Sequence, residues 1–211
     1  MTPEPVLLTR PRPATWIAVF AGVLLWSGIE PKDTVTWMLE VAPAVIAAIV
    51  LLATRRRFPM TRLAYVLILV HCIILMVGGH YTYAEVPAGD WFRDLFEPPR
   101  NNYDKLGHLA QGFVPAIATR EVVIRLDVFN GARWRDFFIV SFCLAVSAFY
   151  ELIEWWVALL SDEAADAFLG TQGYAWDTQS DMLLALVGAV AALTLLGRFH
   201  DRQLAGLAQD L

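Results

Sequence analysis

Residues 147–156 read SAFYELIEWW and place two carboxylates, Glu151 and Glu154, inside an apolar run that extends from Phe137 to Leu160. An acidic side chain at the centre of a membrane-spanning helix costs about 2.5–3.5 kcal/mol on insertion scales, so such groups face the interior of a helix bundle and have partners there. Because they are three residues apart, the two carboxylates share one helix face and can reach the same proton, cation or hydroxyl-bearing ligand. This pair is the centre of the predicted site.

The composition is that of a polytopic membrane protein whose partner is the lipid bilayer. Of the 211 residues, 57% are hydrophobic and 18% are charged, and the mean hydropathy is +0.51. A soluble domain has about 45–50% apolar and about 25% charged residues. The chain has no basic patch with interleaved aromatic residues, which argues against a nucleic-acid partner. Cys72 and Cys143 each lie in an apolar run, so we interpret them as small core residues rather than as a disulfide or a metal site.

The apolar runs predict one all-α membrane domain, residues 1–211, built as a bundle of about six transmembrane helices. The expected spans are 14–29, 34–54, 62–79, 104–121, 136–160 and 177–197. Helices of about 17–25 residues fit a bilayer with short connections. Several prolines make us expect a largely non-helical connection from His80 to Tyr103. Span 104–121 is less apolar than a lipid-facing helix, so we expect it inside the bundle.

The basic residues predict which way the chain crosses the membrane. With a cytoplasmic N-terminus, 12 of the 16 Lys and Arg residues fall on the inner side and only 4 on the outer side. The outer four are Lys32, Arg93, Arg100 and Lys105. Basic residues are enriched in cytoplasmic loops, so both termini are predicted to be cytoplasmic.

In this orientation, three polar clusters reach the outer end of the bundle at the same depth. They are Asp104 with His108, Asp177 with Asp181, and Glu151 with Glu154, while His80 ends the third span. A spacing of i, i+4 presents two ligands on one helix face, as helical metal ligands do. The sequence therefore predicts a divalent-metal site formed by Asp104, His108, Glu151, Glu154, Asp177, Asp181 and His80. Glu151 and Glu154 are the predicted catalytic residues, and Arg100 and Lys105 are predicted to bind an anionic head group of the substrate.

Structural roles are the alternatives for these residues. Asp104 and Asp177 stand where an N-cap is favoured by about 1 kcal/mol. For the remaining cluster members, the alternative is a hydrogen-bond network that holds the helices together; these are Glu151, Glu154, His108 and Asp181. We interpret His71 as a hydrogen-bonded core histidine. An interfacial aromatic belt is the simplest interpretation of Tyr150, Trp155 and Trp156.

Several motifs resemble those of the YjdF-type bacterial inner-membrane proteins, the DUF2238 family. They are RNNYDKLGH at 100–108 with QGF at 111–113, YELIEWW at 150–156, TQG at 171–173, WDTQ at 176–179 with DM at 181–182, and HYTY at 80–83. The resemblance covers nearly the whole chain and implies a six-helix, multi-pass inner-membrane protein, without implying a particular reaction. Tyr174 departs from the acidic residue expected there in the family. The Asp-Lys-x-x-His opening at Asp104 and the later Glu and Asp positions are also similar to VanZ-like membrane proteins, which are associated with glycopeptide tolerance.

Two functional hypotheses follow. The first is a membrane enzyme that binds Mn, Mg, Zn or Fe at the outer face and acts on a lipid-linked or envelope substrate. The second is a non-catalytic carrier or sensor in which Glu151 and Glu154 bind protons or cations. The inner half of the bundle is expected to lack acids that would continue a path, which favours the enzyme. No nucleotide, flavin or serine-nucleophile motif is present, so the only predicted cofactor is a metal ion.

Overall fold

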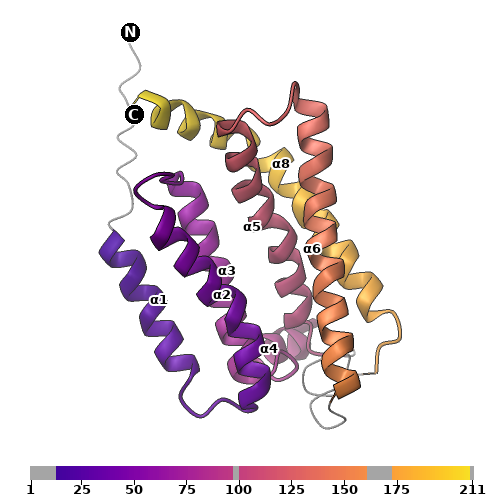
Figure 1. Ribbon diagram of the computed structural model, residues 1–211. Coiled ribbons are helices and arrows are strands. Elements are labelled where there is room, and N and C mark those ends of the chain that lie inside the picture. Colours follow the sequence, from indigo (N-terminus) through magenta and orange to yellow (C-terminus); the bar gives the residue numbers. More distant parts are fainter. Residues whose placement is uncertain (1–12, 97–99, 161–172, 210–211) are drawn as a thin grey trace.

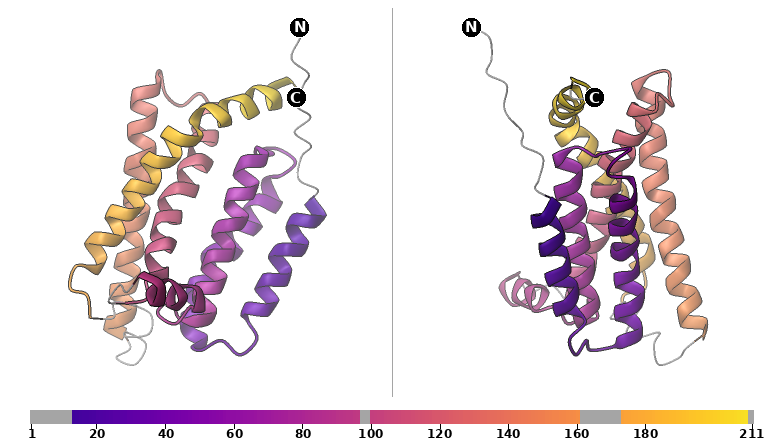
Figure 2. Two further views of the ribbon diagram at one scale, coloured as in Figure 1. Left: turned by 180° about the vertical axis from the view of Figure 1, so that it is seen from behind. Right: turned by 60° about the vertical axis from the view of Figure 1, so that its left-hand side comes forward.

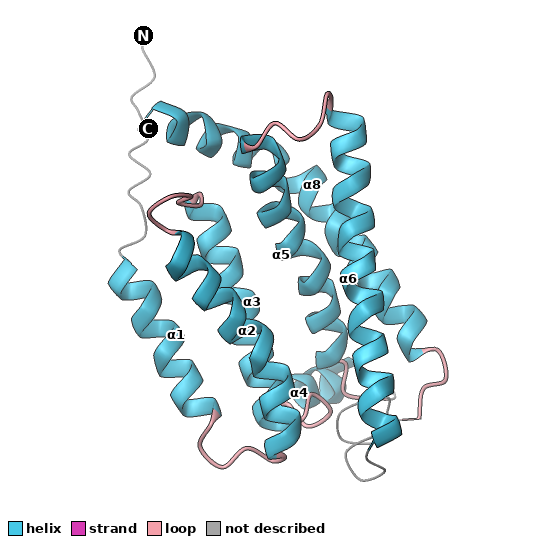
Figure 3. Ribbon diagram, in the orientation of Figure 1, coloured by secondary structure: helices cyan, strands magenta, loops and turns pink. Residues whose placement is uncertain are grey.

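The protein is all-helical over the residues that the structure describes. A computed structural model of the chain describes residues 13–96, 100–160 and 173–209, and no strand occurs among them (Figure 3). The helices are α1 (Pro13–Ser27), α2 (Thr34–Thr54), α3 (Arg62–Tyr81), α4 (Pro87–Phe96), α5 (Tyr103–Arg125), α6 (Ala132–Leu160) and α8 (Asp177–Gln209). The predicted fold class, a polytopic all-α membrane protein, is confirmed.

Four of these helices are long and apolar enough to cross a membrane. They are α2, α3, α6 and residues Asp177–Leu207 of α8. Helix α1 is apolar but only 15 residues long. Helix α5 carries more polar residues and packs against α3, α6 and α8, so it lies inside the bundle as its composition indicated.

The helix bounds differ from the expected spans in two ways. Helices α5, α6 and α8 extend past the apolar runs, to Arg125, back to Ala132 and to Gln209, respectively. Apolar runs mark the part of a helix that lies in lipid, whereas backbone hydrogen bonding continues into the polar flanks. The expectation of a largely non-helical segment from His80 to Tyr103 is wrong over α4. This helix begins at Pro87, a first position at which the missing N–H of proline costs no hydrogen bond.

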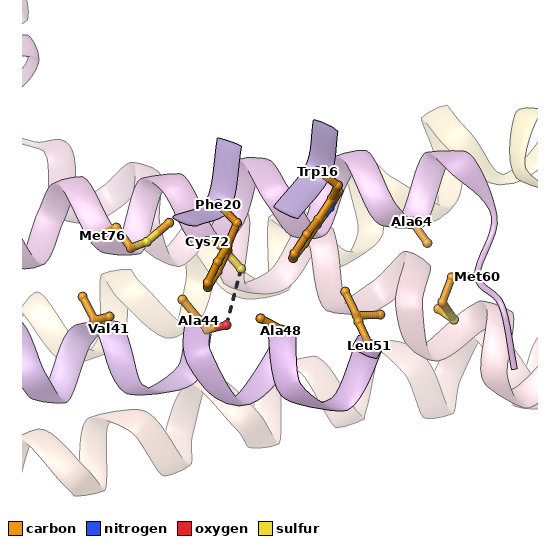
Figure 4. Close-up of a cluster of buried hydrophobic side chains, with 10 residues drawn as sticks. All are labelled: Trp16, Phe20, Val41, Ala44, Ala48, Leu51, Met60, Ala64, Cys72 and Met76. Atoms are coloured by element: carbon orange, nitrogen blue, oxygen red, sulfur yellow. Dashed lines mark hydrogen bonds between the residues drawn. The ribbon is translucent and has the colours of Figure 1, made fainter. Parts of the chain in front are cut away.

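Helices α1, α2 and α3 form one packed layer. Their apolar core is drawn in Figure 4 and consists of Trp16, Phe20, Val41, Ala44, Ala48, Leu51, Met60, Ala64, Cys72 and Met76. The Trp16 indole donates to the Tyr65 carbonyl oxygen over 2.8 Å. Cys72 and Cys143 are both buried free thiols, as predicted.

Small residues bring α5 and α8 into close contact. A Cβ atom at Gly112 would overlap the backbone carbonyl of Ala185, and one at Gly188 would overlap that of Leu109. Ala189, like Ala185, is fully buried in the same seam. Glycine and alanine allow helix backbones to approach closely within a membrane, where van der Waals packing drives association.

The two ends of the bundle differ in charge. The start of α5, the end of α6 and the start of α8 lie together at one end, which we call the acidic end (Figure 1). The opposite end, where α3 begins and α5 finishes, is the arginine-rich end. The last turns of α8 bend across the arginine-rich end (Figures 1 and 2). The acidic end carries the predicted site.

Candidate functional site

The connection into α5 is anchored by a fully buried amide, Asn101. Its Nδ2 donates to the Val86 carbonyl oxygen over 3.0 Å and to the Asp90 carboxylate over 3.1 Å. Its Oδ1 accepts from the Tyr103 backbone N–H over 3.1 Å. These bonds tie the start of α5 to α4 and fix the position of Arg100, the residue before it.

Arg100 and Lys105 join α5 to α8 through the carboxylates of α8. Asp177 Oδ1 accepts from Arg100 Nη2 and from Lys105 Nζ, each over 2.6 Å. Lys105 also donates to Asp181 over 2.6 Å. The ring of Tyr174 lies 5.2 Å from Arg100 Cζ and 5.7 Å from Lys105 Nζ, within cation–π range. Both cations are therefore engaged by α8, and Tyr174 packs over them.

His108 lies where α5, α6 and α8 meet. Its Nε2 is 3.3 Å from Asp104 Oδ1, 3.9 Å from Glu151 Oε1 and 3.9 Å from Asp181 Oδ2. Its Nδ1 lies 3.1 Å from Gln111 Oε1. With its proton on Nδ1, His108 donates to Gln111 and its Nε2 lone pair faces the carboxylates, the orientation that a metal ligand needs, whereas a proton on Nε2 would be donated to Asp104.

Two overlapping sets of side chains have the spacing of a metal site. The first is Asp104, His108 and Asp181, and the second is His108, Glu151 and Glu154; in each set the ligand atoms lie within 4.8 Å of one another. One imidazole with carboxylates is a donor set that suits divalent Mn, Fe or Zn. The helices thus bring together five of the seven predicted metal ligands.

The other two predicted ligands have different surroundings. Asp177 is occupied by Arg100 and Lys105. His80 faces α1, where its Nδ1 is 3.0 Å from the Ser27 carbonyl oxygen and its ring centroid is 4.7 Å from that of Trp26. His80 therefore lies apart from the cluster.

Glu40 of α2 joins the cluster from a helix that the sequence interpretation left out. It is 4% exposed and lies near the hydroxyls of Tyr83 and Tyr150. The turn after α3 folds Tyr83 inward because Thr82 and Tyr83 adopt positive φ values of 59° and 53°. A lone acid within an apolar span is the same signal that identified Glu151, and it would have identified Glu40.

The acidic end has more carboxylates than cations among the described residues. Six carboxyl groups gather around His108, those of Glu40, Asp104, Glu151, Glu154, Asp177 and Asp181, and the permanent cations paired within this group are Arg100 and Lys105. Ionised carboxylates that are removed from water require a counter-charge. Protons or a bound cation must therefore supply the balance.

Several buried polar atoms at this end and along the adjoining part of α3 have no hydrogen-bond partner in the described part of the chain. They are Asp104 Oδ2, Glu151 Oε1, the Tyr150 hydroxyl and His71 Nε2. The interpretation of His71 as hydrogen-bonded is therefore wrong for this nitrogen. Assigning Tyr150 to the aromatic belt is also wrong, since its hydroxyl is buried near Glu40, whereas Trp155 and Trp156 are exposed as expected.

A second polar network lies at the arginine-rich end and is fully paired. Glu121 is completely buried and accepts from the Thr61 backbone N–H over 2.8 Å and from the Thr61 hydroxyl over 2.7 Å. His200 Nε2 and Arg125 Nη1 lie 3.1 Å and 3.0 Å from the same carboxylate. The expectation that this half of the bundle lacks acids is wrong, because Glu121 was assigned to a helix end rather than to the interior.

Comparison with known proteins assigns the chain to a family. The family described as "Predicted membrane protein (DUF2238)" matches residues 12–202. The chain belongs to the DUF2238 family. It is 52% identical over 182 residues to the inner membrane protein YjdF of Escherichia coli (strain K12), a match that covers 86% of this chain and 87% of the relative. No solved structure matches the chain.

Proposed function

We propose that the acidic end is the divalent-cation site of an inner-membrane enzyme that acts on a lipid-linked or envelope substrate at the outer face. The observation that carries the proposal is the position of His108 Nε2, which faces carboxylates from three different helices. The shortage of positive charge around these carboxylates supports it. Purely structural polar residues in a bundle are expected to pair with one another, as Glu121 does.

The side chains divide into groups with different roles. His108 would hold the cation with Asp104 and Asp181 or with Glu151 and Glu154. Such an ion polarises a phosphoryl or carbonyl oxygen, or lowers the pKa of bound water. The carboxylates of Glu151 and Glu154 that do not bind the ion are placed to accept a proton from the attacking group.

Arg100 and Lys105 have a narrower role in this proposal than the sequence indicated. Both already donate to Asp177, so an anionic head group would have to share them with that carboxylate. Their pairing also keeps α8 in register with α5. The outward orientation of this end rests on the distribution of basic residues, 12 of which lie on the side predicted to be cytoplasmic.

Metal content of the purified protein tests the proposal. Wild-type protein, extracted in mild detergent without chelator, is expected to contain a stoichiometric transition metal by elemental analysis. Glu154→Gln and His108→Ala are expected to lose it while remaining monodisperse, because Gln keeps the size but removes the charge. His80→Ala is the matched control, since this histidine lies at the same end but outside the cluster. Absence of metal from the wild type, with a more stable Glu154→Gln variant, would contradict the proposal.

A proton or cation carrier is the second candidate, and the buried Glu121–His200 pair at the opposite end favours it. A carrier needs titratable groups at both ends of its path. Liposomes loaded with a pH-sensitive dye would reveal proton flux through reconstituted protein. Flux that is lost in Glu154→Gln and in Glu121→Gln, while both variants remain monodisperse, supports the carrier, whereas no flux in the wild type excludes it as a proton carrier.

A further inference from the structure

A long cavity of about 690 Å³ extends from the acidic end along the interior of the bundle. It is lined by residues of α2, α3, α5 and α6. On α2, the lining extends from Glu40 to Thr54, a distance of about 21 Å at about 1.5 Å per residue. The cavity therefore covers much of the hydrocarbon core of a bilayer, which is about 30 Å thick.

The lining of this cavity is polar mainly at one end. Glu40, His108, Tyr150 and Glu154 line the part at the acidic end. Beyond them the walls are mainly apolar and include Ala47, Val50, Ala118, Val122 and Val146. A polar head with a long apolar tail is the shape of a membrane amphiphile, and the order of the lining residues matches it.

The cavity opens toward the bilayer between α2 and α6. Helix α2 packs against α3 and makes no comparable contact with α6 in the described residues. Val50 and Phe149 line the cavity from these two helices and are 52% and 54% exposed. A hydrocarbon chain can thus enter sideways from the membrane without crossing an aqueous phase.

We propose that this cavity binds one hydrocarbon chain of a lipid whose oxygen-rich head group lies against the acidic end. The inference rests on the proposed function and names the class of its substrate. Two unpartnered polar atoms, the Tyr150 hydroxyl and His71 Nε2, belong to residues that line the cavity and are available to such a ligand.

The charges at the cavity end specify how the head group is held. The acids that line the cavity are Glu40, Asp104 and Glu154, whereas Arg100 and Lys105 are bound to the α8 carboxylates and do not line it. A phosphate would be repelled by these three acids alone. An oxygen-rich head group is therefore held through the cation bound at His108, so its binding depends on the metal, while the fit of the chain depends on the apolar walls.

Photolabelling separates these two contributions. The probe is a long-chain alkyl phosphate with a diazirine in its chain, added to the full-length protein in nanodiscs with Mn²⁺ or with chelator. Ala47→Phe and Ala118→Phe each place a phenyl ring in the cavity, one from α2 and the other from α5. Each is expected to lower labelling about tenfold, because about two chain methylenes lose their contacts. Ile49→Phe is the matched control, since Ile49 is exposed on α2 and does not line the cavity.

The outcomes distinguish this inference from the proposed function. Labelling that falls in both cavity variants, remains in Ile49→Phe and requires Mn²⁺ supports both. An alkyl-trimethylammonium probe that labels the cavity without Mn²⁺, while the phosphate probe never does, contradicts the oxygen-rich head group. Equal labelling of Ala47→Phe, Ala118→Phe and Ile49→Phe overturns the inference even if metal is bound, because the label then reports only surrounding lipid. The size-exclusion profile of each variant shows that it is folded.

Discussion

Two buried glutamates at opposite ends of the bundle have different surroundings. Glu121 has hydrogen bonds to both oxygens and two basic neighbours. Glu151 has one oxygen with no hydrogen-bond partner among the described residues and lies 3.9 Å from His108. A buried carboxylate with every partner in place is suited to hold a structure together. One that lacks partners is suited to bind something, and this contrast is the reason that we propose a binding role for Glu151 and a structural role for Glu121.

Glu121→Gln is expected to destabilise the protein by about 3 kcal/mol, because His200 and Arg125 then lose a buried carboxylate. Asp201→Asn is the matched control at the same end. The Asp201 side chain is 57% exposed and pairs with Arg120, so its loss is expected to cost less than about 1 kcal/mol. Thermal unfolding in detergent compares the two variants. Similar melting temperatures for both would contradict a structural role of Glu121.

Asp33 caps α2, and its carboxylate accepts from the Thr36 backbone N–H over 2.6 Å. The hydrogen bonds from Thr36 hold the pKa of Asp33 below its ordinary value. A lowered pKa means that the ionised form stabilises the fold above the unfolded pKa, about 3.9, and that this contribution is lost as the pH falls through the folded value. Asp33→Ala is expected to cost about 1 kcal/mol at pH 7 and less at pH 3.

The variant Asp33→Asn retains an acceptor for the Thr36 N–H and serves as the control. Its stability at neutral pH is expected to lie close to that of the wild type. A difference between Asp33→Ala and the wild type that stays constant from pH 7 to pH 3 would show that the charge of the cap contributes nothing. Thermal melting at both pH values provides the measurement.

At the level of elements, α5 is the helix on which the site depends. Its first turns carry Asp104 and His108, and its remaining length packs against α3, α6 and α8. The glycine seam sets the distance between α5 and α8, and thereby the distance from His108 to Asp181. A change in the seam is therefore expected to affect the site even where no ligand residue changes.

Gly188→Ala is expected to push α5 and α8 apart, because the added methyl group would overlap the Leu109 carbonyl. Gly197→Ala, on the same helix, is the matched control, since nothing lies within 4 Å of its Cβ position. Overpacking costs about 1–3 kcal/mol, so only the first variant should melt at a lower temperature and lose bound metal. Unchanged melting and metal content in Gly188→Ala would show that the seam tolerates a wider spacing.

The sequence predicted which residues of the candidate site lie close together, because charged residues in apolar runs are few and helical spacing is regular. Asp104 and His108 meet as i, i+4 neighbours, and Glu151 approaches them from α6, as expected. The position of His80 could not be predicted, since the depth of a residue does not specify which neighbour its helix face contacts. The cavity could not be predicted from the sequence either, because it depends on how α2 and α6 are placed on α3 and α5.

At the level of the whole molecule, the long helices α1, α2, α3, α5, α6 and α8 alternate in direction, so the acidic end lies on one side of the membrane (Figure 1). Reporters fused after Arg57 or at the C-terminus are expected to be cytoplasmic. Reporters within 88–93 or 162–166 are expected to be external, although 162–166 lie outside the described residues. The basis is the enrichment of basic residues in cytoplasmic loops.

This topology is measured by fusing each position to two reporters that are active on opposite sides of the membrane, such as alkaline phosphatase and a fluorescent protein. At each position, one fusion serves as the control of the other. A cytoplasmic signal from 162–166 would place Glu151, Glu154, Asp177 and Asp181 on the cytoplasmic side. The cation site would then draw on the cytoplasmic metal pool, and an envelope substrate would be excluded.

The sideways opening between α2 and α6 has a practical consequence for handling the protein. An opening that admits a lipid chain also admits a detergent tail, so solubilisation replaces the native occupant by mass action. Extraction with a polymer that cuts out a disc of native membrane keeps the original lipids at the opening. Mass spectrometry of such discs, compared with detergent-washed protein, would then identify the molecule that occupies the opening in the native membrane.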